Sequence, residues 1–213
     1  MIYCVFLKPS TPVIATRAGD YPEWHCGREK FSLWYLEIQH PELLTYLNQL
    51  QSAFTDFLYA PNTRQFHITL FVCGFLTPHS AVLNDDFTIG QLQQQLTELS
   101  RMQPQTIQLK TGSIQSFSSA LFVEIIDEQG QLLKLRDRLA QHSSEIAPLA
   151  YCPHLTLGLY RDSFNSDLIF NQIEQIQQKT FDLSIDQLIF GTYQAQVLQG
   201  PLSPFQHVQL ETL

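Results

Sequence analysis

Apolar residues recur along this 213-residue chain with two different spacings. Segments rich in aromatic and β-branched residues, several with alternating polarity, predict strands. These segments are residues 31–38, 64–72, 106–109, 120–126, 151–160, 181–190 and 205–210, with residues 1–7 as a further candidate. Apolar residues three or four positions apart predict helices in residues 41–54, 89–102, 127–142 and 167–179. Because strands and helices do not alternate regularly, we expect an α+β fold.

Proline and glycine residues mark where several of these elements should begin or end. Pro41 suits the first turn of a helix, and Pro104 cannot continue the helix that precedes it. The polar residues 112–119 are predicted to form a turn region. Residues 8–30 contain several prolines and glycines and are predicted to be rich in loops.

One short pattern occurs twice, each time inside a predicted strand. Residues 66–70 read Phe-His-Ile-Thr-Leu and residues 153–157 read Pro-His-Leu-Thr-Leu. Side chains alternate between the two faces of a strand, so His67 and Thr69 share one face. His154 and Thr156 share a face in the same way, opposite Leu155, Leu157 and Leu159. Two such strands facing each other would line a cleft with two imidazoles and two hydroxyls.

Composition is that of an ordinary globular protein. Hydrophobic residues make up 44% of the chain and charged residues 15%, and the length allows one domain or two packed lobes. No apolar run reaches the roughly 18 residues that a membrane span needs, and the N-terminal apolar stretch lacks the basic lead of a signal peptide. We therefore expect a cytoplasmic protein without a membrane partner. The four scattered cysteines are expected to be reduced and structural.

Net charge and missing motifs exclude several classes of function. The net charge of −8 argues against binding long duplex nucleic acid, which needs a basic surface. It leaves room for a small nucleotide or an RNA end held by a few local cations. The chain has no Gly-rich phosphate loop, no GxSxG elbow and no paired-carboxylate signature, which argues against kinases, P-loop ligases and serine hydrolases.

The paired motif suits proton transfer at a phosphodiester. Near pH 7 one imidazole can be neutral and accept a proton from water, while the other is charged and donates a proton to the leaving alkoxide. The hydroxyls of Thr69 and Thr156 can donate hydrogen bonds to the non-bridging oxygens. This chemistry requires no metal and no cofactor. Which of His67 and His154 is the acid stays open.

The two motifs resemble those of the two-histidine (2H) phosphoesterase superfamily, especially the LigT-like RNA 2′,3′-cyclic phosphodiesterases of the 2′-5′ RNA ligase family. The resemblance runs from about Phe31 to the C-terminus as an order of elements, which indicates a divergent member. Residues 1–30 have no counterpart in it and are an unplaced N-terminal extension. The resemblance implies one bilobed domain over residues 1–213, with two pseudo-symmetric lobes of antiparallel sheet, helices outside, and a central cleft lined by the motif strands.

The resemblance also implies an activity and a set of site residues. It implies hydrolysis of a 2′,3′-cyclic phosphate or a 2′–5′ linkage, in a small nucleotide or an RNA end. His67 and His154 match the catalytic positions of the motif, and Thr69 and Thr156 match its phosphate-binding positions. A monomer is favoured.

Other side chains near the motifs are further candidates. Tyr160 shares the parity of His154 and is predicted to stack on a base or bind phosphate, with a rim position as the alternative. Arg161 follows the second motif, where a cation can meet phosphate. Arg64 falls on the opposite face from His67 if the strand is regular, and is predicted to lie on the surface. Lys134, Arg136 and Arg138 are predicted on the solvated face of a helix.

Two alternatives remain open at this point. A non-catalytic module that binds a nucleotide or RNA would retain the same cleft with little turnover. Alternatively, His67 and His154 could hold a metal ion.

Overall fold

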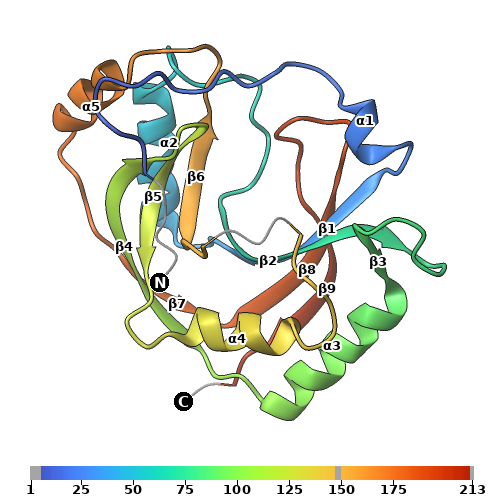
Figure 1. Cartoon of the computed structure of the whole chain (residues 1–213). Coiled ribbons are helices and arrows are strands. Elements are labelled where there is room, and N and C mark those ends of the chain that lie inside the picture. The colour runs from blue at the N-terminus through green and yellow to red at the C-terminus, as the bar shows by residue number, and fades with distance from the viewer. Residues whose placement is uncertain (1–5, 147–149, 212–213) are drawn as a thin grey trace.

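The computed structural model describes residues 6–146 and 150–211. Its helices are α1 (Pro22–His25), α2 (Pro41–Ala53), α3 (Ile89–Met102), α4 (Gln131–Leu139) and α5 (Ser166–Glu174). Its strands are β1 (Lys30–Glu37), β2 (His67–Thr77), β3 (Asp86–Thr88), β4 (Ile107–Ser116), β5 (Ala120–Ile126), β6 (His154–Leu159), β7 (Asp182–Ile185), β8 (Gln187–Gln194) and β9 (Ser203–Gln209). Figure 1 shows these elements as a curled sheet with helices around it.

The strands form one continuous sheet made of two matching halves. The order is β7-β4-β5-β6-β2-β1-β8-β9, and β3 pairs in parallel with β2 at one side. The other strand pairs are antiparallel. The motif strands β6 and β2 meet at the centre, where Ile68 pairs with Leu155. The expected α+β fold with two pseudo-symmetric lobes is therefore confirmed, and the two lobes join in one sheet.

The helices before the two motif strands are exchanged between the halves. Helix α2 precedes β2 in the chain but packs against β6, and α4 precedes β6 but packs against β2. A side chain from each helix binds the backbone of the strand it covers. Gln51 Nε2 donates to the Leu157 carbonyl at 2.7 Å, and Arg136 donates to the Leu70 carbonyl.

Arg136 does not lie on a solvated helix face, which corrects the prediction made for it. Its side chain is only 13% exposed. The guanidinium donates a hydrogen bond to the Glu145 carboxylate and forms an ion pair with it. The guanidinium also lies over the Tyr151 ring, 3.9 Å from the centroid. The helical period places Arg136 next to Leu132, Leu135 and Leu139, so its stem follows the apolar stripe of α4 while Glu145 neutralises its charge.

Local signals set several element boundaries. Helix α3 begins and ends as predicted, because Thr88 and Gln91 form a capping box and Gln103 ends the helix in the left-handed conformation. Strand β5 also has its predicted bounds.

The predicted turn region 112–119 is instead largely strand, because β4 continues through an irregularity between Thr111 and Ile114 and pairs with β5. The predicted strand 181–190 is two strands that meet at Asp186.

The N-terminal extension runs across both halves of the molecule. Residues 1–5, which include most of the first strand candidate and Cys4, lie outside the described residues. Further on, the N–H groups of Val13 and Thr16 donate to the carbonyls of Phe164 and Tyr160, both at 2.8 Å. The blue trace in Figure 1 then passes over the top of the molecule to α1 on the opposite side.

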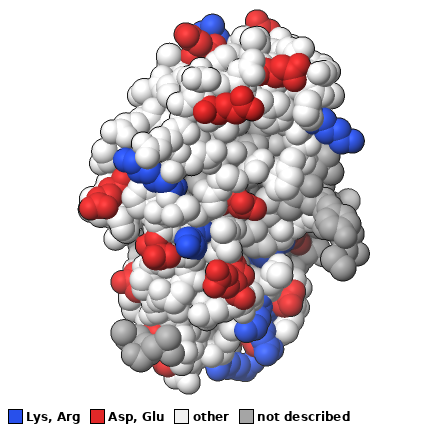
Figure 2. Space-filling view, turned by 90° about the vertical axis from the view of Figure 1, so that its left-hand side faces the viewer, with Lys and Arg blue, Asp and Glu red and all other residues white. Residues whose placement is uncertain are grey.

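Three further observations concern the other cysteines, the helices and the surface. Cys26, Cys73 and Cys152 are not in disulfides, and Cys73 is buried. In the described ranges, none of the helices combines the length and apolar character needed to cross a bilayer. On the face drawn in Figure 2, Lys and Arg side chains lie among Asp and Glu side chains and do not merge into a continuous basic surface.

Candidate active site

The two motifs lie side by side at the centre of the sheet. Ile68 and Leu155 pair across β2 and β6 and are fully buried on the core face. The antiparallel direction of the strands then brings His67 beside Thr156 and Thr69 beside His154, on the opposite face. All four of these polar side chains are partly exposed. The predicted alternation of faces and the predicted meeting of the two motifs are therefore observed.

Both histidines are held in the same tautomer by backbone carbonyls that come just before their strands. His67 Nδ1 lies 2.7 Å from the carbonyl of Gln65, and His154 Nδ1 lies 2.6 Å from the carbonyl of Cys152. A carbonyl oxygen can only accept, so each Nδ1 carries the proton and donates it. Each neutral imidazole consequently presents Nε2 as its free acceptor. The hydrogen bond from Nδ1 to the carbonyl two residues earlier thus occurs in both halves of the sheet.

The neighbouring strands repeat this symmetry. Tyr35 on β1 pairs with Thr69, and its ring lies edge-on to His67 at a centroid distance of 5.7 Å. Phe122 on β5 pairs with Thr156, and its ring lies 5.1 Å from that of His154. Each histidine is thus packed against an aromatic ring from the strand next to its own, which restricts its orientation.

Burial lowers the pKa of both histidines. The pKa of His67 falls from 6.5 to about 4, mainly because the ring is desolvated, although its bond to Gln65 acts in the opposite direction. The positive charge of Arg64 and the second imidazole lower the pKa of His67 further. The pKa of His154 is also lowered by burial. Both imidazoles are therefore neutral at pH 7 in the free protein.

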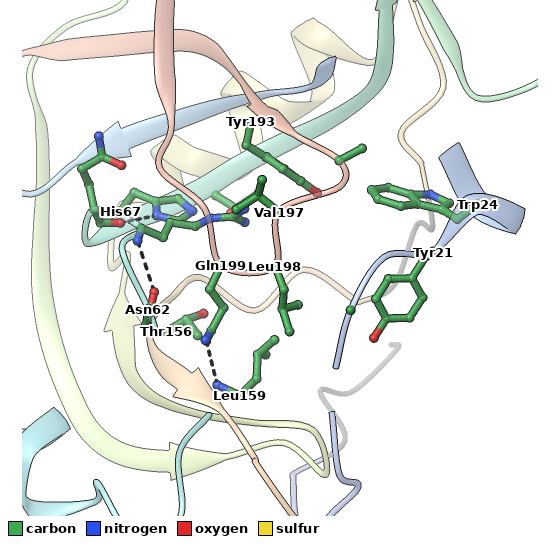
Figure 3. A pocket seen from close by; sticks show the side chains of 15 residues that line it. Tyr21, Trp24, Asn62, His67, Thr156, Leu159, Tyr193, Val197, Leu198 and Gln199 are labelled. Atoms are coloured by element: carbon green, nitrogen blue, oxygen red, sulfur yellow. Dashed lines mark hydrogen bonds between the residues drawn. The ribbon is translucent and has the colours of Figure 1, made fainter. Parts of the chain in front are cut away.

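A cavity of about 320 Å³ opens beside this face of the sheet. His67, Thr69 and Thr156 line it, whereas His154 is not among its lining residues and packs against the rings of Phe117 and Phe122. Figure 3 shows His67 and Thr156 on one side of the pocket. The volume lies at the lower end of the range for small-ligand sites.

Arg64 lines this pocket, and the prediction that it lies on the surface is wrong. Its Nε donates to the Gly200 carbonyl at 2.9 Å, and its guanidinium lies over the Tyr193 ring, 4.0 Å from the centroid. Within the described chain it has no carboxylate partner. The parity argument failed because β2 begins only at His67, so Arg64 belongs to the preceding irregular segment. The pocket therefore contains a partly buried cation without a counter-ion.

Tyr160 lies in the core, so the prediction that it shares the face of His154 is wrong. It is fully buried, and its hydroxyl lies 2.6 Å from Ser116 Oγ. The cause is an irregularity in β6, where Thr156 pairs with Phe122 but Gly158 pairs with Leu121. The extra residue reverses the parity, so Leu159 lines the pocket instead of the core.

Arg161, the other candidate near the second motif, is exposed and is not among the residues that line the pocket. Its position therefore does not favour phosphate contact at this cavity. For the alternative of a metal site, the described residues contain no group of three or more His, Cys, Asp or Glu side chains placed to hold an ion. His67 and His154 would thus have no further ligand of these types there.

Several pocket residues come from segments without any sequence signal. The connection between β8 and β9 supplies Ala195, Val197, Leu198 and Gln199, and the N-terminal extension supplies Gly19, Tyr21 and Trp24. The first segment is fixed to the loop before β2, since Gln65 exchanges two hydrogen bonds with Leu202 at 3.0 and 2.8 Å. Only the folded chain brings these residues to the motif.

A sheet whose two central strands each present a His-x-Thr motif on the same face is the arrangement of a 2H phosphoesterase. The model of the 2′-5′ RNA ligase superfamily matches residues 40–196, and this chain belongs to that family. A search of the curated proteins finds no match. The family assignment confirms the resemblance drawn from the paired motifs.

Solved structures of the same fold agree with this assignment. The crystal structure of E. coli LigT complexed with 3′-AMP has a TM-score of 0.57 and 11% sequence identity, covering 85% of this chain and 98% of LigT. The structure of E. coli LigT complexed with phosphate has a TM-score of 0.52 and 12% sequence identity, covering 87% of this chain and 99% of LigT. The structure of TT0787 of Thermus thermophilus has a TM-score of 0.56 and 11% sequence identity, covering 85% of this chain and 98% of TT0787. At these identities the likeness establishes the fold.

Proposed function

We propose that this protein is a phosphodiesterase that hydrolyses a cyclic phosphate or a 2′–5′ linkage in a small nucleotide or an RNA end. The observation that carries the proposal is the matched pair of imidazoles, His67 and His154. Each is fixed through Nδ1 by a backbone carbonyl and presents Nε2 on the same face of the sheet. Membership in a superfamily of 2H phosphoesterases supports the reaction class.

In the proposed reaction, one histidine acts as base and the other as acid. The Nε2 atom of the neutral histidine takes a proton from water, and the water oxygen forms a bond to phosphorus. The bond from phosphorus to the leaving ribose oxygen breaks, and the protonated histidine donates its Nε2 proton to that oxygen. The products are a phosphomonoester and a free hydroxyl. Neither step requires a metal or a cofactor.

The remaining polar groups would bind the phosphate. Thr69 and Thr156 can donate hydroxyl hydrogen bonds to the non-bridging oxygens, whose negative charge grows as the water attacks. Arg64 lines the same pocket, has no carboxylate partner among the described residues, and would neutralise part of that charge. An anion bound there would also raise the pKa of the histidine that serves as acid, because opposite charge favours the protonated form.

One observation favours the alternative of a nucleotide- or RNA-binding module with little turnover. Both histidines have a lowered pKa in the free protein, so neither is charged at neutral pH before a ligand binds. If bound phosphate does not restore one proton, the cleft would bind its ligand without cleaving it.

Hydrolysis of a panel of nucleoside 2′,3′-cyclic monophosphates, with EDTA present, separates these proposals. We expect the wild type to turn over at least one of them, and His67→Ala or His154→Ala to slow turnover by about 10²-fold or more. His207→Ala, an exposed histidine on β9, is the matched control and should keep full activity. If the wild type binds these nucleotides without turnover, the binding module is the correct function. Loss of turnover with EDTA would refute the metal-independent mechanism.

A further inference from the structure

The pocket has two chemically different ends. Polar groups that suit phosphate lie at one end, from β2, β6 and the loop before β2. The rings of Tyr21 and Trp24 form the other end (Figure 3), and the apolar lining between the two ends comes from Tyr193, Ala195, Val197 and Leu198. Figure 3 shows Trp24 and Tyr21 across the pocket from His67 and Thr156. A ligand that fills both ends must combine an anionic group with a flat apolar group.

Two of the aromatic residues come from outside the part of the chain that matches the family. Tyr21 and Trp24 belong to the N-terminal extension, whereas the match begins at residue 40. The extension is fastened to the sheet just after α1. Arg28 Nη1 lies 2.7 Å from an Asp86 carboxylate oxygen, and Arg28 Nη2 lies 3.0 Å from one of Asp85. Part of the wall of the pocket is thus built by a segment outside the residues that match the family.

Packing holds both rings at the pocket. The Trp24 ring lies 4.9 Å from Phe31 and 5.1 Å from Phe75, measured between ring centroids. The guanidinium of Arg17 lies over the Tyr21 ring, 4.1 Å from its centroid. Arg17 is itself paired with Glu23 at 2.6 Å, so this cation adds no unpaired charge to the rim. Both rings are therefore held by packing, and Arg17 adds no unpaired positive charge beside them.

The geometry points to a nucleobase site formed by the N-terminal extension, with Tyr21 and Trp24 as the residues that bind the base. This inference rests on the proposed function, because it assumes that the phosphate lies at His67 and Thr156. The ligand class is then a nucleoside that carries its phosphate on the ribose 2′ or 3′ oxygen. Rings that offer stacking faces accept every base, and the larger purines gain more from them.

The extension also limits the size of the ligand. It runs from the half that contains Phe164 and Tyr160 to the half that contains Asp85, and it supplies lining residues on the way. A cavity of about 320 Å³ with this wall accommodates a single nucleotide at the reacting phosphate. A free nucleotide or the last nucleotide of a chain would fit this space.

Calorimetry with two probes tests the base site without requiring turnover. The probes are adenosine 3′-monophosphate and glycerol 2-phosphate, which carry the same phosphate with and without a base. We expect the wild type to bind the nucleotide at least tenfold more tightly. Trp24→Ala should weaken nucleotide binding by about 5- to 100-fold, as stacking losses do, and leave glycerol 2-phosphate unchanged. An equal effect on both probes, or none on the nucleotide, overturns the inference.

Additional variants guard against a misfolded Trp24→Ala protein. Trp24→Phe keeps an aromatic ring against Phe31 and Phe75, and Tyr21→Leu tests the second ring independently. Both should bind the nucleotide more weakly than the wild type, whereas Phe205→Ala, an exposed ring on β9, should not. The chain has two tryptophans, and Trp34 is fully buried, so nucleotide binding should change fluorescence in the wild type but not in Trp24→Phe.

Turnover separates failure of this inference from failure of the proposed function. Selective loss of nucleotide binding in Trp24→Ala, with no hydrolysis by the wild type, would retain the base site and refute the phosphodiesterase. Hydrolysis of glycerol 1,2-cyclic phosphate and of adenosine 2′,3′-cyclic phosphate with equal kcat/KM, unchanged in Trp24→Ala, would retain the phosphodiesterase and refute the base site.

Discussion

Ile68 pairs with Leu155 where the two halves of the sheet meet, and this pair sets the relative position of the two motifs. Both side chains are fully buried below the sheet, while the His and Thr on either side of each lie above it. A shift of one residue between β2 and β6 would turn one motif into the core. The apolar pair therefore fixes the register that the polar residues need.

The threonines test the phosphate-binding end of the site. Thr156→Val keeps the volume of the side chain but removes the hydroxyl, so we expect slower hydrolysis of a cyclic nucleotide with little change in thermal stability. The loss of one hydrogen bond to a charged oxygen corresponds to about a 10- to 100-fold lower kcat/KM. Thr97→Val, at an exposed position of α3, is the control. Full activity in Thr156→Val would remove this residue from the mechanism.

Arg64 is the residue whose role depends most on the structure. Arg64→Gln removes the cation from the pocket, and we expect KM for an anionic substrate to rise about 10- to 100-fold. The KM of Arg64→Lys should lie between those of the wild type and Arg64→Gln, since lysine keeps the charge but not the planar guanidinium over Tyr193. Arg161→Gln is a matched control at an exposed position. An unchanged KM in Arg64→Gln would show that the phosphate lies elsewhere.

The lowered histidine pKa values determine how the rate should depend on pH. In the free protein both values lie below 6.5, so the form with one charged and one neutral histidine is most abundant at acid pH. We expect kcat/KM to peak below pH 6.5 and kcat to peak at higher pH, because bound phosphate raises the pKa of the acid. Steady-state rates from pH 4 to 9 measure both. A kcat/KM that still rises above pH 9 would contradict the acid–base pair.

The same pKa shift affects folding stability. His67 has a pKa of about 4 when folded and about 6.5 when unfolded, so between these values the unfolded chain binds a proton that the folded chain does not. Its contribution to stability is complete above pH 6.5 and is lost as the pH falls toward 4. Urea unfolding of the wild type and His67→Asn at pH 7, 5.5 and 4.5 should give a smaller pH dependence for the variant. His207→Asn should behave as the wild type does.

The ion pair between Arg136 and Glu145 should matter for stability. Both side chains are 13% exposed, so Arg136→Met leaves a carboxylate poorly solvated without its partner. Removing one member of such a pair costs about 3 kcal/mol. We expect a corresponding fall in the midpoint of urea unfolding, partly restored in Arg136→Met/Glu145→Gln. A loss below about 0.5 kcal/mol would mean that the pair behaves as an exposed one.

The sequence predicted those parts of the fold that depend on short-range patterns. Helix α3 and strand β5 were placed correctly because a capping box, a helix stop and an uninterrupted apolar run are local signals. The motif residues shared a face as predicted, because β2 and β6 are regular at those positions. The expectation failed at Tyr160, where one extra residue in β6 reversed the parity.

Most of the pocket could not have been predicted from the sequence. Arg64 was misplaced because the start of β2 depends on pairing with β1 and β6, which local pattern does not specify. Trp24 and Tyr193 are about 170 residues apart in the chain and meet at the pocket only through the path of the N-terminal extension. The catalytic roles of His67 and His154 remain predictions until activity is measured.

The exchange of α2 and α4 makes each half of the sheet dependent on the other. A half that folded alone would leave the apolar side of its own motif strand uncovered, because the helix that precedes that strand crosses to the opposite half. Two copies of one half could complete each other only by trading helices, which is the geometry of a domain-swapped dimer. The present chain joins such a pair covalently. The half of the sheet that carries His67 therefore needs the half that carries His154 in order to fold, and the reverse also holds.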